Sequence, residues 1–93
     1  MPLFVLHCID RAGRLEARKA AREAHLAHIQ ASGAVKLAGP MLDEAGEMAG
    51  SLIIIEADDL ASAKAFSAGD PYLKAGVFER VDIRPFRLAI GAL

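Results

Sequence analysis

The chain has 93 residues, of which 54% are hydrophobic, and its eleven basic and twelve acidic residues leave a net charge of −1 at pH 7. This length fits a single domain, residues 1–93, and the charge balance argues against nucleic-acid or anionic-membrane partners, which need a basic excess. The apolar runs are far shorter than the ~20 residues that cross a bilayer, and we find no targeting signal. We therefore expect a cytoplasmic protein.

The residues between the glycines and prolines predict four strands and two helices in alternation. Residues 14–32 contain no glycine or proline, are rich in alanine and are followed by Gly33, a typical helix C-cap. Asp58 or Asp59 is suited to cap the second helix, which Gly69 ends. The expected helices span 14–32 and 60–68, and the expected strands span 3–9, 34–38, 49–57 and 77–86.

Three short segments carry signals for a strand end or a turn. Gly39–Pro40 is expected to end the second strand, because proline donates no hydrogen bond to a ladder. Residues 43–47 are polar and contain a glycine, as in a hairpin. Asp70-Pro71-Tyr72 predicts a tight turn or a single helical turn, since proline suits the first helical position.

The order β-α-β-β-α-β predicts a ferredoxin-like α+β fold, in which two helices cover one face of a four-stranded antiparallel sheet. Residues 3–9 and 52–55 offer apolar side chains to both faces, whereas a sheet with one wet face alternates apolar and polar residues. An uncovered apolar face of this size exceeds what monomers usually expose. We therefore expect a homodimer formed through the open sheet face.

Three polar residues of the first helix lie where apolar residues are expected. On a helical wheel they fall at spacing i, i+4, i+7 within the apolar arc. They are Arg18, Arg22 and His25, and the arc is bounded by Leu15, Ala21, Leu26 and Ile29. Either the arginines reach carboxylates around the sheet edge while the histidine is a satisfied core residue, or the three line a pocket. In such a pocket the arginines would hold an anion and the histidine would move a proton.

Of the remaining histidines and the single cysteine, His28 and Cys8 are expected to be structural, and the role of His7 is left open. His28 lies near the helix end, where an imidazolium suits the helix dipole. His7 points away from its strand neighbours, toward either the pocket or the dimer interface. His25 and His28 have metal-binding spacing, but no carboxylate or cysteine joins them on that face, so we expect neither a metal nor a cofactor. Cys8 is expected to be a small buried hydrophobe.

Several short motifs, in this order and spacing, resemble the YciI-like (YCII-related domain) family. They are Arg18-x-x-x-Arg22-x-x-His25-Leu26, Ala38-Gly39-Pro40, Gly50-Ser51-Leu52, Asp70-Pro71-Tyr72 and Ala75-Gly76-Val77, with Asp10 before them and Arg84-Pro85-Phe86 after them. The resemblance covers nearly the whole chain. It implies a dimeric α+β barrel, in which two ferredoxin-like sheets pack face to face.

The resemblance also implies an active site built on a histidine and an aspartate, which match His25 and Asp70. One relative is a dehydrochlorinase of a chlorinated hydroxyhydroquinone, and muconolactone isomerase shares the broader fold. Taken alone, Asp70 is most simply an N-cap for the turn at Pro71. Ser51 either donates a hydrogen bond to substrate or serves local turn chemistry, and Tyr72 is expected to line the pocket.

These residues support three hypotheses about function. The first is a cofactor-independent lyase, isomerase or dehydrochlorinase-like enzyme in which His25 is the base, Asp70 orients it, and Arg18 and Arg22 clamp a small anion. The second is a non-catalytic module that binds a small anionic ligand in the same pocket. The third is a structural dimer whose arginines are tied up in ion pairs. The fold alone does not choose among them.

Overall fold

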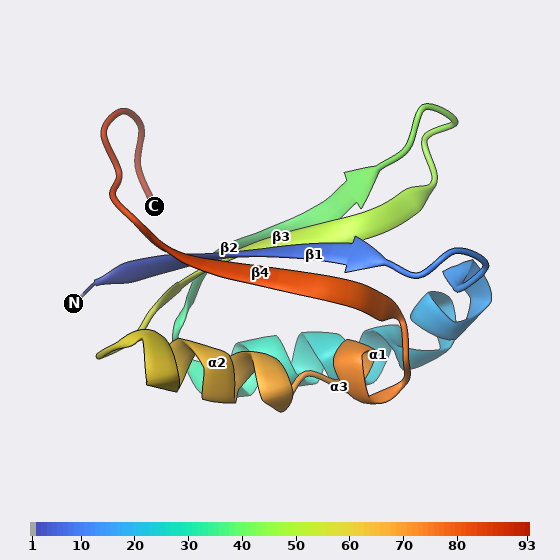
Figure 1. The fold of residues 1–93 in the computed structure, drawn as a ribbon, viewed down its shortest axis with the longest axis horizontal. Helices are drawn as coiled ribbons and strands as arrows, with labels where there is room; N and C mark the ends of the chain where they lie inside the picture. The colour runs from blue at the N-terminus through green and yellow to red at the C-terminus, as the bar shows by residue number, and fades with distance from the viewer. Residues whose placement is uncertain (1) are drawn as a thin grey trace.

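The structure, a computed structural model, describes residues 2–93 and contains one four-stranded sheet with helices on one of its faces (Figure 1). In chain order the elements are β1 (Leu3–Asp10), α1 (Leu15–Ser32), β2 (Val35–Leu42), β3 (Met48–Glu56), α2 (Leu60–Ala68), α3 (Pro71–Lys74) and β4 (Phe78–Phe86). The sheet order is β2-β3-β1-β4, and every neighbouring pair is antiparallel. The predicted ferredoxin-like α+β fold is confirmed.

The helix boundaries follow from their caps. Gly33 ends α1 in the left-handed conformation, with φ 66°, which glycine adopts without strain. Asp59 caps α2, and its carboxylate accepts a hydrogen bond of 2.8 Å from the backbone N–H of Ser62. Asp70 caps the single turn α3, with Pro71 at its first position. None of the helices within residues 2–93 combines the length and the apolar composition that a membrane-spanning helix needs.

The prediction that Gly39–Pro40 ends the second strand is wrong, because β2 continues through both residues to Leu42. β2 lies at an edge of the sheet, so only one side of the strand has to pair. Proline is tolerated on edge strands, where its missing N–H removes no bond from a central ladder. Pro40 lies opposite Ser51 of β3, so the end of β2 pairs with the part of β3 that contains Ser51.

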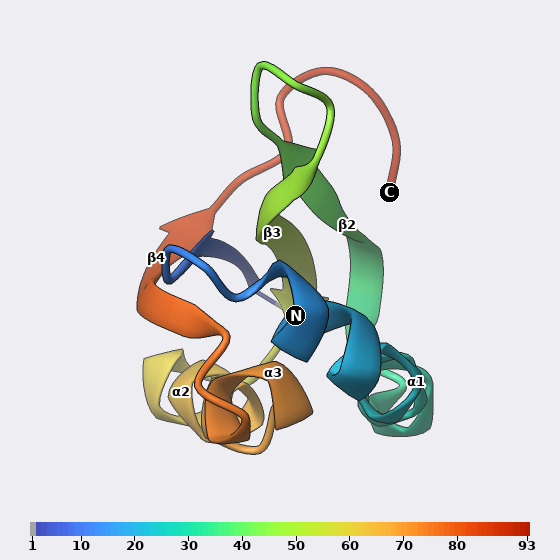
Figure 2. The same ribbon diagram turned by 90° about the vertical axis from the view of Figure 1, so that its right-hand side faces the viewer.

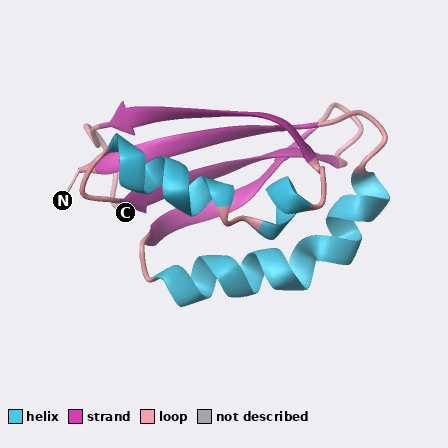
Figure 3. Cartoon of the chain, turned by 60° about the horizontal axis from the view of Figure 1, so that its bottom comes forward, coloured by secondary structure: helices cyan, strands magenta, loops and turns pink. Residues whose placement is uncertain are grey.

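The core lies between the sheet and the helices, which run beneath it in two rows (Figures 2 and 3). Alternate residues of the two central strands point into it. These are Phe4, Leu6 and Cys8 of β1 and Ile53 and Ile55 of β3. The same alternation turns Asp10 and Ser51 toward the helices, one at the end of β1 and the other near the start of β3. These two residues therefore form the polar end of an apolar layer.

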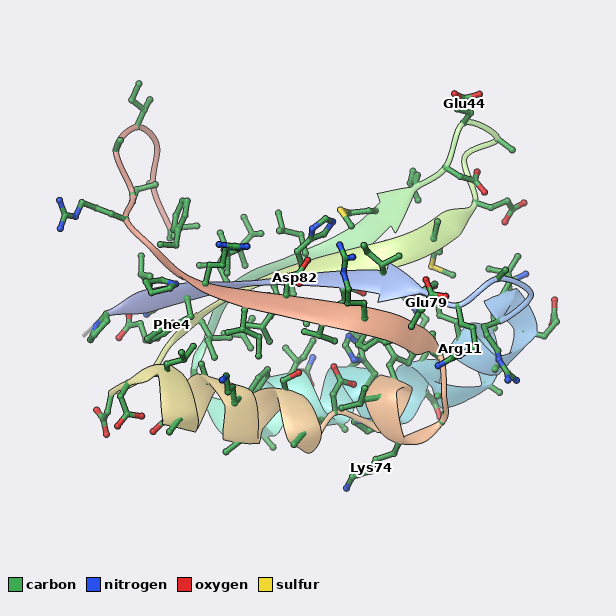
Figure 4. All side chains as sticks on the ribbon, in the orientation of Figure 1. Phe4, Arg11, Glu44, Lys74, Glu79 and Asp82 are labelled. Carbon is green, nitrogen blue, oxygen red and sulfur yellow. The ribbon has the colours of Figure 1, made fainter. Side chains whose placement is uncertain are left out.

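The opposite face of the sheet has no helix over it within residues 2–93 (Figures 1 and 4). Val5 pairs with Ile54 on this face, and His7 pairs with both Leu52 and Asp82. A groove of about 380 Å³ on this face is lined by Val5, His7, Met41, Leu52, Asp82 and Arg84. The two directions left open for His7 are thus resolved: its side chain is exposed on the open face of the sheet, away from the helices.

Candidate functional site

A partly enclosed cavity of about 150 Å³ lies between α1 and the strands β2 and β3. Side chains from four elements line it. Its polar lining consists of Arg18, Arg22, His25, Ser51 and Tyr72, and its apolar lining includes Leu26, Ile29, Pro40, Met48 and Ile53. All five polar residues were singled out from the sequence, and the structure brings them to one cavity.

The helix α1 buries polar side chains in place of apolar ones. Its two buried residues are Arg18 and His25, which are 2% and 5% exposed, while Leu26 is 37% exposed. Arg22 belongs to the same stripe but is exposed at the rim of the cavity. Burying a cationic or polar group costs several kcal/mol unless it is paired, so the partners of these two residues decide what the site can do.

His25 is paired with Asp70, which is 2% exposed. The distance between His25 Nδ1 and Asp70 Oδ1 is 2.8 Å, and the same oxygen accepts a hydrogen bond of 2.9 Å from the backbone N–H of Tyr72. Asp70 is therefore both the cap of α3 and the partner of the imidazole. Because a carboxylate only accepts hydrogen bonds, Nδ1 carries the proton, and in the neutral imidazole the lone pair is therefore on Nε2. Nε2 has no protein partner within residues 2–93.

Arg18 is paired with Asp10 and Ser51. Its Nη1 donates to both carboxylate oxygens of Asp10, at 2.9 and 3.0 Å, and its Nη2 donates to Ser51 Oγ at 2.7 Å. The sheet explains this meeting: Cys8 lies opposite Ser51, so the ends of β1 and β3 present a carboxylate and a hydroxyl to one turn of α1. The Arg18 Nε atom is buried and has no hydrogen-bond partner among the described residues.

The ring of Tyr72 packs against both of these pairs. It stacks on the His25 imidazole with ring centroids 3.9 Å apart and planes 13° apart, and the Arg18 guanidinium carbon lies 4.6 Å from its centroid. Burial raises the pKa of the Tyr72 phenol, and the positive charges of Arg18 and Arg22 oppose that shift. The phenol therefore stays neutral at physiological pH and supplies a flat, rigid wall to the cavity.

Other titratable residues do not join the site. His28 Nε2 lies 3.2 Å from the Phe66 carbonyl oxygen, and its ring packs on the Phe66 ring. Burial raises the pKa of the Cys8 thiol to about 12, so it is a neutral core side chain and no nucleophile. Within residues 2–93 no three histidine, cysteine or acidic side chains gather as a metal site would require.

Asp10 is the site residue to which sequence reasoning assigned no partner. The interpretation that arginines reach carboxylates near the sheet edge was general, and it named no acceptor. Asp10 shares the alternation of Leu6 and Cys8, which points it toward the helices. This alternation of residues along the strand can be read from the sequence. The sequence does not show which turn of α1 lies above the end of β1.

Comparison with known proteins agrees with this architecture. The family model of the YCII-related domain matches residues 2–87. The protein YciI of Escherichia coli is 39% identical over 94 residues, covering 91% of this chain and 96% of that one. An uncharacterized protein of Haemophilus influenzae is 38% identical, covering 90% and 95%.

Among solved structures, the 5-chloro-2-hydroxyhydroquinone dehydrochlorinase of Burkholderia phenoliruptrix, in complex with 2,5-dihydroxybenzoquinone, superimposes with a TM-score of 0.85. It is 29% identical, and the match covers 94% of this chain and 95% of that one. The family match spans all seven elements of the fold and every residue of the cavity. The chain belongs to the YCII-related domain family.

Proposed function

We propose that this protein is an enzyme that catalyses proton transfer on a small anionic ring compound, with His25 as the general base. The observation that carries the proposal is the 2.8 Å contact between His25 and the buried Asp70 at the wall of a cavity. A carboxylate that fixes the tautomer of an imidazole leaves the other ring nitrogen available as a general base. The similar dehydrochlorinase, whose reaction removes a proton and a chloride, supports the same class of chemistry.

In the proposed reaction, His25 Nε2 takes a proton from a hydroxyl group or carbon of the ring compound. The electron pair left behind forms an enolate. Asp70 stabilises the imidazolium that forms, without taking up the proton itself. The imidazolium then gives the proton to a ring carbon, which completes an isomerisation. Where that carbon carries chlorine, it becomes tetrahedral, and deprotonation of a second hydroxyl group then forms a carbonyl group and expels chloride, which completes an elimination. Such a base contributes about 10²–10⁴-fold to a rate.

The size and charge of the cavity support a single-ring substrate. A volume of about 150 Å³ matches a cavity that holds benzene in another protein. The exposed guanidinium of Arg22 at the rim is free to meet an anionic substituent of such a ring. Within the described residues Arg22 has no carboxylate partner within 4.0 Å.

The test uses 5-chloro-2-hydroxyhydroquinone as substrate and measures release of chloride. We expect His25→Asn to reduce turnover by at least about 10²-fold while the circular dichroism spectrum is unchanged. His28→Asn is the matched control, because His28 lies one turn along the same helix and contacts Phe66 outside the cavity. Equal rates for the wild type and His25→Asn would refute the assignment of the base.

We also propose that two copies associate through the open sheet face. Val5, Leu52 and Ile54 form an apolar strip there, and sheets pack face to face about 10 Å apart over such strips. Leu52→Glu, which puts a charge into the strip, should convert the dimer to a monomer in sedimentation equilibrium. Leu60→Glu on the exposed side of α2 is the control. A wild type that sediments as a monomer at 100 µM would overturn the proposal.

A further inference from the structure

The hydroxyl group of Ser51 has a defined hydrogen-bonding direction. Ser51 is 2% exposed, and its Oγ accepts a hydrogen bond from Arg18 Nη2 at 2.7 Å. A serine hydroxyl can accept and donate at once, so this bond leaves its proton to be donated elsewhere. No acceptor for that proton lies among residues 2–93, and Ser51 lines the cavity. A buried donor without an acceptor is costly, unless a water or a ligand atom in the cavity accepts its bond.

The guanidinium of Arg18 is held too firmly to clamp a substrate itself. Asp10 accepts two bonds from Nη1, and Ser51 accepts one from Nη2. The side chain is 3% exposed and lies against the ring of Tyr72. Its Nε is buried and unpaired, so this placement has a cost that the ion pair does not remove. What the placement achieves is a fixed position for Ser51 Oγ.

The local backbone brings Ser51 close to β1. A Cβ at Gly50 would lie 2.5 Å from the carbonyl oxygen of Cys8, so only glycine permits this approach of the two strands. The hydroxyl is therefore held from two sides, by the strand pairing behind it and by the Asp10–Arg18 pair beside it. A donor held in this way loses little entropy when a ligand binds.

From these contacts we infer that Ser51 donates the hydrogen bond that stabilises the oxyanion of the ring ligand, and that Arg18 and Asp10 are positioning residues. The ligand class is an enolate or quinonoid oxygen on a single ring, so the inference rests on the proposed function. The Ser51 proton stays on Ser51 throughout. The positive charge of Arg18 polarises the hydroxyl through Oγ and strengthens its bond to a negative oxygen. Acid–base chemistry at His25 and oxyanion stabilisation at Ser51 thus belong to different groups of the same cavity.

The test measures binding of 2,5-dihydroxybenzoquinone by calorimetry, so it does not depend on turnover. A bond to a charged oxygen predicts about 10- to 100-fold weaker binding in Ser51→Ala. Because this donor favours the ionised ligand, the pH at which the bound quinone ionises, read from its visible spectrum, should rise in the same variant. Ser67→Ala is the control, since Ser67 is also buried but lies on α2 away from the cavity.

A double-mutant cycle separates positioning from direct contact. If Arg18 acts through Ser51, Arg18→Lys weakens binding, and adding Arg18→Lys to Ser51→Ala has less than a twofold further effect. Additive losses would mean that Arg18 touches the ligand itself and would overturn the positioning role. Asp10→Asn gives the same comparison where Arg18→Lys does not fold.

The remaining outcomes separate this inference from the proposed function. Quinone that binds Ser51→Ala and the wild type equally, or does not bind the wild type at all, overturns the oxyanion assignment. His25→Asn should keep quinone binding within about threefold while it loses turnover. If turnover survives in His25→Asn but Ser51→Ala still loses binding, the base is wrong and the oxyanion donor stands.

Discussion

Replacing Asp70 by asparagine separates the two functions of this carboxylate. One oxygen, Oδ1, accepts hydrogen bonds from both His25 Nδ1 and the Tyr72 backbone N–H. An asparagine oxygen in the same place can accept both bonds, so the cap of α3 and the tautomer of His25 should persist. The negative charge is lost. Its effect appears only when His25 becomes an imidazolium during the reaction.

The magnitude follows from the geometry. Two charges about 4 Å apart attract by about 4 kcal/mol at the effective dielectric of a protein site, which bounds the effect at about 10³-fold in rate. The proton is only partly transferred in the transition state, so we expect Asp70→Asn to lower kcat by about 10- to 10²-fold. The smaller loss than in His25→Asn reflects the retained tautomer. Chloride release from 5-chloro-2-hydroxyhydroquinone at pH 7.5 measures both variants.

Asp59→Asn is the matched control, because Asp59 caps α2 in the same way and contacts no residue of the cavity. It should keep the rate of the wild type. Two results would refute the reasoning about Asp70. A rate for Asp70→Asn within twofold of the wild type would show that its charge does not act on His25. A loss equal to that of His25→Asn, in a folded protein, would show that the tautomer is not retained.

Three further outcomes follow from the structure. Arg22→Ala should weaken binding of 2,5-dihydroxybenzoquinone about two- to fivefold at low salt and have no effect at 1 M salt, because an exposed charge at the rim is screened by salt. Lys19→Ala, the control, should leave quinone binding unchanged. Burial raises the pKa of the Cys8 thiol to about 12, so Cys8 should resist labelling by iodoacetamide at pH 8 until denaturant is added. Rapid labelling of the native protein would contradict the burial of this side chain. Gly50→Ala should lower the free energy of unfolding, measured by urea titration, by about 1–3 kcal/mol, because the added Cβ meets the Cys8 carbonyl oxygen. Gly39→Ala is the control and should leave the free energy of unfolding unchanged, because the space at its Cβ is open.

The fold could be predicted because its signals are local. Glycines and prolines divide the chain, and the period of apolar residues separates strands from helices. The missed part was the length of β2, since the effect of Pro40 depends on whether its strand lies at an edge, which only the sheet order decides. The polar stripe of α1 could also be predicted from local sequence, because residues at i, i+4 and i+7 lie on the same face of a helix whichever element packs against it.

The pairings within the site could not be derived from such patterns. Asp70 is 45 residues from His25, and by itself it predicts only the N-cap that it also forms. The resemblance to the family, not the periodicity, suggested that the two residues belong together. Likewise the partners of Arg18 depend on the register of β1 with β3 and on the turn of α1 above it. Sequence reasoning expected Arg18 to hold an anion, and its two Nη atoms are occupied by Asp10 and Ser51.

The protonation of the His25 ring tests the central claim most directly. Nitrogen-15 NMR of the imidazole distinguishes a protonated nitrogen from one that carries a lone pair. We expect Nδ1 to be protonated and Nε2 to carry the lone pair in the free protein, and the Nε2 resonance to shift when 2,5-dihydroxybenzoquinone is added. A proton on Nε2 of the neutral ring, or an Nε2 resonance that does not move at saturating quinone, would contradict a base at the cavity wall.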